Sequence, residues 1–418
     1  MFLTVKGRWK KVNPWVRRLI LGCSVIIVLA GLGYGFFQRK ITAIQPSAFY
    51  TPPKVLPAGV PGTIIRKELL TDDLPKNAIA WRVLYLSTDL NGKPIAVSGT
   101  VVAPKEKSPS SRPVIAWAHG TIGVLPQCGV SHTPHPYKQT PVVDLMVNQG
   151  FVVVATDYPG LGTPGVHPYL IGNVSARSIL DSVRSARQLD VNASDRFVVW
   201  GASQGGQAAL WAVQSAAEYA PELKLVAAAA SAPAINLAGI IKAKMDDQGG
   251  GVFIGEALYA WAHHYPNANL DNIIRPQQRA QFNRMATTCV STPAAFLTIG
   301  TLLKPSEYLS VNLLQTEPWR TIIEQNTPRG RVKVPLLITH GTADTLIPLE
   351  LSEIEVKRRC ALGENVQLIR LPGVGHDARN ESGILTVGWI EDRFAGYPFG
   401  ATCNVSSAKG KMTAFAKD

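Results

Sequence analysis

The stretch 199–207, which reads VWGASQGGQ, constrains the fold more than any other part of the chain. It places Ser203 two residues from a glycine on either side, after a short apolar run (197–200) and before helix-forming residues (204–219). A Gly-x-Ser-x-Gly turn between a strand and a helix is so tight that the flanking positions must be nearly free of side chains. The turn lifts the serine hydroxyl above the sheet, at the positive end of the helix. Ser203 is therefore a candidate nucleophile.

The rest of the chain alternates in the same way between apolar strand-like segments and helical patterns. Continuous apolar runs separated by helices are typical of a parallel sheet that is buried on both faces. The first two strand segments are joined by Asn91-Gly92 and predict an antiparallel hairpin. We predict strands at 81–87, 95–103, 114–118, 151–156, 197–200, 225–230, 334–339 and 366–371. We predict helices at 139–149, 174–189, 204–219, 349–362 and 379–394.

A serine nucleophile needs a general base, and the base needs a carboxylate that orients it. His376 lies in the glycine-rich loop LPGVGHDARN after the last predicted strand, and Asp344 lies in HGTADTLIP, directly after the strand 334–339. The chain order Ser203, Asp344, His376 is the one expected of α/β-hydrolases. His340 and His119, each at a strand end beside a glycine, are expected to be structural.

Acyl transfer also needs hydrogen-bond donors for the developing oxyanion. The backbone N–H of Gln204, next after the nucleophile, is the first candidate. The backbone N–H of Thr121, in the loop AHGTIG, is the second, and Gly120 is the alternative donor in the same loop.

The segment 234–330 interrupts the alternation between two predicted strands and is too long for one crossover. We therefore predict an α/β-hydrolase fold with a mostly parallel central sheet. A helical cap (lid) is inserted at 234–330, before the acid-bearing strand. The domain as a whole is expected to span 63–418.

The N-terminus predicts a membrane segment. Residues 1–40 carry eight basic residues and no acidic one, so they account for +8 of the net charge of +13 and leave +5 for the remainder. We expect no nucleic-acid partner, since the remainder shows no basic stripe. The uncharged run 19–37 is long enough to span a bilayer, and a proline-rich linker (38–62) follows it.

The basic segment 1–18 is expected to stay in the cytoplasm, because more basic residues precede the span than follow it. This arrangement predicts a signal anchor that holds an exported catalytic domain on the periplasmic or extracellular side. The alternative is a cleaved signal peptide and a secreted protein.

Five cysteines are present, and one of them, Cys23, lies in the apolar run 19–37. An even number in an exported domain suits two disulfides, and four cysteines allow three pairings. No spacing of cysteines and histidines suggests a metal site, and we expect no cofactor. The four remaining cysteines are Cys128, Cys289, Cys360 and Cys403.

The motifs GASQGG, AWAHGTIG, DYPGLGTPGVHPYL (157–170), HGTADTLIP and GVGH together resemble the secretory lipase family over residues 114–405. The resemblance implies an α/β-hydrolase fold with a cap before the acid-bearing strand and hydrolysis of carboxylic esters, often acylglycerols. It also implies that the cysteines pair in chain order, Cys128 with Cys289 and Cys360 with Cys403. Members of the family are typically released, whereas the predicted anchor would hold this chain at the membrane.

Two other functions stay open. A serine peptidase of the prolyl oligopeptidase type uses a similar turn on the same fold, but no repeat array precedes residue 114. A catalytically silent, exported binding protein on the hydrolase fold is the other alternative. Hydrolysis of an amide would favour the peptidase. Failure to react with a serine-directed phosphonate would favour the binding protein.

Overall fold

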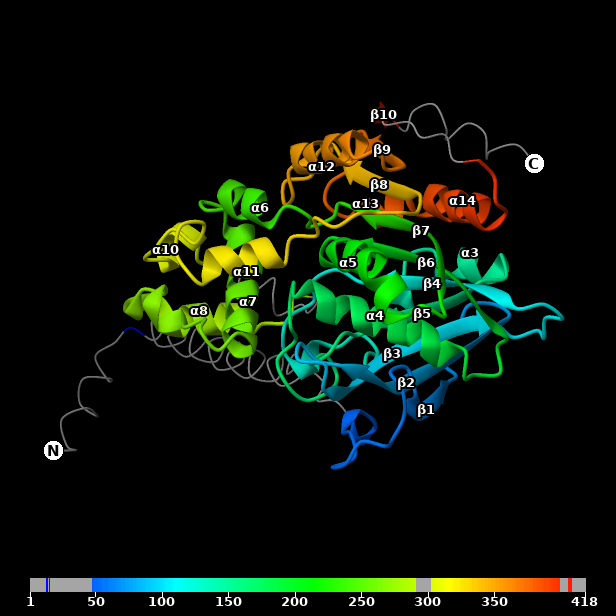
Figure 1. Ribbon diagram of the computed structural model, residues 1–418. Helices are drawn as coiled ribbons and strands as arrows, with labels where there is room; N and C mark the ends of the chain where they lie inside the picture. Colours follow the sequence, from blue (N-terminus) through cyan, green and yellow to red (C-terminus); the bar gives the residue numbers. More distant parts are fainter. Residues whose placement is uncertain (1–12, 14, 16–46, 291–301, 399–404, 408–418) are drawn as a thin grey trace, which may run out of the picture.

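The computed structural model describes residues 13, 15, 47–290, 302–398 and 405–407 (Figure 1). The predicted membrane segment 19–37 and Cys403 lie outside these residues. Within the described part of the chain, no helix combines the length and the apolar character needed to cross a bilayer.

A central sheet runs through the molecule, with strand order β1-β2-β3-β5-β4-β6-β7-β8-β9-β10. The pairs from β1 to β5 in this order are antiparallel, and all pairs from β5 to β10 are parallel. The strands are β1 (Ile64–Leu70), β2 (Ala78–Thr88), β3 (Pro94–Pro104), β4 (Arg112–Ala118), β5 (Val152–Thr156), β6 (Ala193–Ala202), β7 (Lys224–Ser231), β8 (Leu336–Gly341), β9 (Val366–Leu371) and β10 (Val405–Ser407).

All eight predicted strands are present in the sheet. The predicted hairpin is β2–β3, in which Thr88 pairs with Pro94 across a loop that contains Gly92 at a φ of +78°. β1 was missed because its centre, Arg66-Lys67-Glu68, is charged and hides the strand pattern. It is the antiparallel neighbour of β2 and lies at the end of the strand order, where a charged strand is tolerated because one side of it faces water.

Helices cover both faces of the sheet. On one face, α4 (Gly172–Ala186), α5 (Gln204–Tyr219) and α12 (Leu349–Ala361) pack against the strands, and Ile179, Leu210 and Val356 belong to one buried cluster. On the other face, α3 (Val143–Asn148), α13 (Ala378–Glu381) and α14 (Gly383–Phe394) bury Met146 and Ile390. The predicted helix 379–394 is thus two helices, α13 and α14, separated by Ser382.

The chain between β7 and β8 forms a helical cap beside the sheet (green to yellow, Figure 1). Leu258, Phe282 and Trp319 of the cap are buried in an apolar cluster that also includes Ile171 and Val174, so the cap packs against the start of α4. Its helices are α6 (Leu237–Ala243), α7 (Gln248–His264), α8 (Arg279–Ala286), α10 (Pro305–Tyr308) and α11 (Trp319–Gln325), with the short 3-10 turns η4 (Leu270–Asn272) and η5 (Pro276–Gln278). The predicted fold class, a mostly parallel sheet with an inserted helical cap, is confirmed.

Part of the predicted linker packs on the folded domain. Tyr50, in the 3-10 turn η1 (Ala48–Tyr50), is buried, and its hydroxyl lies 3.0 Å from that of Ser131. The guanidinium of Arg66 donates to the carbonyls of Ala48 and Phe49. Residues 48–50, within the predicted linker 38–62, thus pack against the folded domain, where burial of the Tyr50 ring stabilises the contact.

Candidate active site

The Gly-x-Ser-x-Gly stretch forms a sharp turn between β6 and α5. Ser203 has a φ of +55°. This backbone conformation is unfavourable for any residue that carries a side chain, and it persists only where the surrounding structure enforces it. A Cβ at Gly201 would lie 2.1 Å from the carbonyl oxygen of Gly205, and a Cβ at Gly205 would lie 1.9 Å from that of Ala118. Packing against the neighbouring strand and helix therefore requires both glycines.

Three predicted residues from three separate loops meet above this turn. The Nε2 atom of His376 lies 3.0 Å from Oγ of Ser203, and its Nδ1 atom lies 2.8 Å from Oδ2 of Asp344. Ser203 follows β6, Asp344 follows β8 and His376 follows β9, so the parallel sheet brings the loops at its carboxyl edge together. A base within hydrogen-bond reach of a hydroxyl, itself held by a carboxylate, is the arrangement for activating a serine.

The carboxylate of Asp344 is completely buried and has several polar neighbours. Its Oδ1 atom accepts hydrogen bonds from the backbone N–H groups of Leu346 and Ile347, at 2.8 and 2.9 Å. Burial alone would raise the pKa of Asp344, but His340 and His376 outweigh burial and hold the pKa of this carboxyl well below its usual range. Asp344 is therefore ionised, as the partner of an imidazole that collects a proton must be.

His340, which the sequence predicts to be structural, lies against the same carboxylate. Its Nε2 atom is 3.1 Å from Oδ2 of Asp344 and 3.0 Å from the carbonyl oxygen of Ile347. Its Nδ1 atom lies 2.8 Å from Oγ of Ser352 on α12. The spacing of four residues between His340 and Asp344 was the only sequence signal for this contact.

The two predicted oxyanion donors lie on the segments that flank the nucleophile. Gln204 is the first residue of α5, where backbone N–H groups have no partner within the helix. Gly120 lies next to the serine, since a Cβ built on it would be 3.5 Å from Cβ of Ser203. Thr121 follows, and its hydroxyl lies 2.8 Å from that of Tyr169.

An apolar pocket opens at Ser203 between the turn and the cap. The walls come from the cap helices α6 and α7 and from the loop after β8, and the chemistry of the walls suits a hydrocarbon chain. Lys244 also lines the pocket, but its ammonium group donates to the carbonyl of Thr345. The apolar lining includes Leu237, Ile241, Ile254, Leu258, Trp261 and Leu313.

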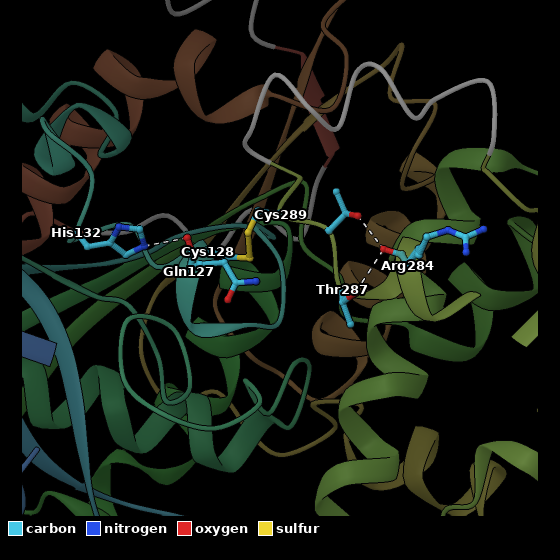
Figure 2. Close-up of a disulfide and its surroundings, with 7 residues drawn as sticks. Gln127, Cys128, His132, Arg284, Thr287 and Cys289 are labelled. Carbon is cyan, nitrogen blue, oxygen red and sulfur yellow. Dashed lines mark hydrogen bonds between the residues drawn. A yellow bond between two sulfur atoms is a disulfide. The ribbon is translucent and has the colours of Figure 1, made fainter. Parts of the chain in front are cut away.

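A disulfide ties the cap to the loop that carries Thr121. Cys128 and Cys289 form a disulfide, which is the first of the two pairings that the family resemblance implies. Figure 2 shows the bond beside Gln127. The backbone N–H of Val290 donates to the carbonyl of Ile122, at 3.1 Å, so the two segments are also joined through the backbone. The second pairing, of Cys360 with Cys403, stays a prediction, because Cys403 lies outside the described residues.

In the described ranges, no group of three or more histidine, cysteine, aspartate or glutamate side chains is placed to hold a metal ion. The triad arrangement needs none for acyl transfer.

Comparisons with known proteins find several lipases that match most of the chain. The chain is 26% identical to Lipase 10 of Candida albicans, an alignment that covers 90% of this chain and 86% of that protein. It is 27% identical to a probable inactive lipase of Mycobacterium tuberculosis, with 86% and 85% covered. The structure of Candida antarctica lipase A superposes with a TM-score of 0.76 at 21% identity, covers 88% of this chain and 90% of that one, and shows the same α/β-hydrolase fold. The family model for secretory lipases matches residues 136–401, well over half of the 418 residues. The chain therefore belongs to the secretory lipase family.

Proposed function

We propose that this carboxylic ester hydrolase cleaves esters of long-chain acids, acylglycerols among them, through Ser203, His376 and Asp344. The observation that carries the proposal is the pair of contacts of His376, 3.0 Å to Oγ of Ser203 and 2.8 Å to Oδ2 of Asp344. An ionised, buried Asp344 supports it, because this carboxylate fixes the tautomer of His376 in which Nε2 is free to accept a proton.

The reaction follows from this geometry. Oγ of Ser203 attacks the ester carbonyl while Nε2 of His376 takes the hydroxyl proton, and the carbonyl oxygen becomes an oxyanion. Backbone N–H groups of Gln204 and Thr121 stabilise that charge. The C–O bond to the alcohol breaks, His376 returns the proton to the leaving alcohol, and water hydrolyses the acyl-enzyme by the same route.

The substrate class is argued from the pocket. An apolar acyl chain buries its surface against Ile254, Leu258 and Trp261, and each buried CH₂ contributes about 0.8 kcal/mol. A peptide substrate would need polar partners for its backbone, which these side chains do not offer. The apolar lining therefore favours an ester of a long acid over an amide.

The test is hydrolysis of p-nitrophenyl esters from C2 to C16 by the full chain and by its Ser203→Ala variant. Loss of a triad member costs several orders of magnitude in kcat, and we expect kcat/KM to rise with chain length up to the capacity of the pocket. A folded wild type that turns over an amide panel but none of the esters would favour the peptidase alternative. A folded wild type that also fails to react with a serine-directed phosphonate would favour a silent binding protein, as the probable inactive relative in Mycobacterium tuberculosis suggests.

We also propose that the hydrolase unit spans 63–418 and is exported, as the family name implies. The segment 19–37 would anchor it at the membrane, whereas cleavage of this segment would release it. Sequencing the N-terminus of the mature protein decides between the two: a first residue between 30 and 50 would show that the segment is removed.

A further inference from the structure

The 157–170 segment, DYPGLGTPGVHPYL, follows β5 and is buried except at 164–166, and its Tyr169 and Leu170 line the pocket at Ser203. In the sequence, this segment contributes only to the resemblance to the secretory lipase family. In the structure, however, Tyr158, His167 and Tyr169 are all almost completely buried, and each makes a polar contact with a segment that carries an expected oxyanion donor.

Two tyrosines hold the loop after β4. The hydroxyl of Tyr158 donates to the carbonyl of His119, at 3.1 Å, and the two rings pack with their centroids 4.6 Å apart. The hydroxyl of Tyr169 lies 2.8 Å from that of Thr121. The loop that presents Gly120 and Thr121 is thus held on both sides by the 157–170 segment.

His167 holds the other donor segment. Its Nδ1 atom lies 3.0 Å from the carbonyl oxygen of Pro159, and its Nε2 atom lies 2.7 Å from Nε2 of Gln204. A carbonyl only accepts, so Nδ1 carries the hydrogen, and a neutral imidazole must then accept at Nε2 from the amide of Gln204. Burial lowers the pKa of His167 to about 3, so the ring is neutral over the physiological range.

A side-chain anchor matters at Gln204 because this residue begins a helix. The backbone N–H groups of a first turn have no partner within the helix, and an oxyanion donor must stand 2.7–3.1 Å from the position of the developing charge. A buried side chain of Gln204 that is held by His167 restrains the backbone at this residue, and with it the direction of the N–H group of Gln204.

We propose that the 157–170 segment is the scaffold of the oxyanion hole, and that His167 is a positioning residue that acts on the oxyanion through the side chain of Gln204. The inference rests on the proposed function. His167 itself touches none of the reacting atoms. A displaced donor weakens binding of the transition state more than binding of the ester.

The test compares two variants of one histidine. The amide of asparagine can replace Nδ1 as donor to Pro159 but cannot reach Gln204, whereas the longer glutamine places an acceptor near the position of Nε2. We expect His167→Asn to lower kcat for a p-nitrophenyl ester about 10- to 100-fold with KM within about threefold. We expect His167→Gln to restore most of the loss.

A second readout separates positioning from general destabilisation. A trifluoromethyl ketone adds to Ser203 as a hemiketal whose oxyanion occupies the hole, so its Ki should rise by the same factor by which kcat/KM falls. Gln204→Leu keeps the backbone N–H but removes the anchor, and it should match His167→Asn. The double variant should cost no more than either single one, because both remove one interaction.

The matched control is Ser87→Ala on β2, which removes an equally buried side-chain hydrogen bond outside the 157–170 segment and outside α5. Ser87 is as buried as Gln204, and its hydroxyl donates to Oδ2 of Asp181, at 2.7 Å. It should lower the melting temperature but change kcat less than threefold. If Gln204→Leu and His167→Asn behave like this control, the inference is wrong although the enzyme is a hydrolase. If the wild type hydrolyses no ester, the proposed function itself has failed.

Discussion

Acidification should destabilise this protein through His167, and the size of the effect follows from its environment. The pKa of His167 is lowered by burial from 6.5 to about 3. Between these two pH values the unfolded chain binds a proton that the folded chain does not, so the free energy of unfolding falls as the pH drops through this window. Each pH unit is worth about 1.4 kcal/mol, so His167 should remove about 2 kcal/mol between pH 7 and pH 5.

The perturbation that isolates this contribution is His167→Gln, which removes the titration and retains an acceptor for Gln204. At pH 7 the variant should be about 1 kcal/mol less stable than the wild type, because the hydrogen bond to Pro159 is lost. Between pH 7 and pH 5 the free energy of unfolding of the wild type falls by about 2 kcal/mol through His167, whereas the variant has no such loss. The variant should therefore be the more stable protein at pH 5. Urea unfolding at both pH values, followed by tryptophan fluorescence, measures the two differences.

The other titrating groups cancel in this comparison, since both proteins contain them. The control is Thr327→Val, which removes the buried hydrogen bond from Thr327 to the carbonyl of Ile323 but no titratable group, so its stability difference from the wild type should be the same at both pH values. A stability difference between the wild type and His167→Gln that is the same at pH 7 and pH 5 would refute the reasoning. It would mean that His167 is hydrated or charged in the folded protein.

Three further changes test the turn, the disulfide and the histidine beside the acid. Gly205→Ala should abolish soluble expression, because the new Cβ would lie 1.9 Å from the carbonyl oxygen of Ala118 and both atoms belong to rigid backbone. Replacing Cys128 and Cys289 together by serine should lower the free energy of unfolding by about 2–5 kcal/mol in urea titrations, because the bond closes a loop across a separation of 161 residues. His340→Leu should lower kcat about tenfold at unchanged KM in ester hydrolysis, because the acid that orients the catalytic base loses a buried polar neighbour.

Each of these has its own control or contrary outcome. Gly375→Ala places a Cβ where no atom lies within 4 Å, so it should express normally. A dithiothreitol-treated wild type that unfolds at the same urea concentration as the oxidised protein would contradict the role of the disulfide. For His340, the exposed His263→Leu is the comparison, and equal kcat values for the two variants would show that His340 has no influence on the reaction.

The sequence determined the fold class because its signals are local. Apolar runs of strand length separated by helical patterns require a covered parallel sheet, and the Gly-Ala-Ser-Gln-Gly stretch needs a strand before it and a helix after it. Chain order then pointed to Asp344 and His376, because each follows a predicted strand at the same edge of the sheet. The sequence did not predict β1 or the packing of Tyr50. Strand pairing in β1 and burial of Tyr50 oppose what the neighbouring charged and proline residues favour locally.

Only the tertiary structure decided which polar groups meet. The distances from His376 to Ser203 and Asp344 join residues up to 173 positions apart, and no local pattern encodes them. The contact of His340 with Asp344 and that of His167 with Gln204 depend on how loops fold back over the sheet. A buried polar group must find a partner, but the sequence does not say which one, since long-range packing makes that choice.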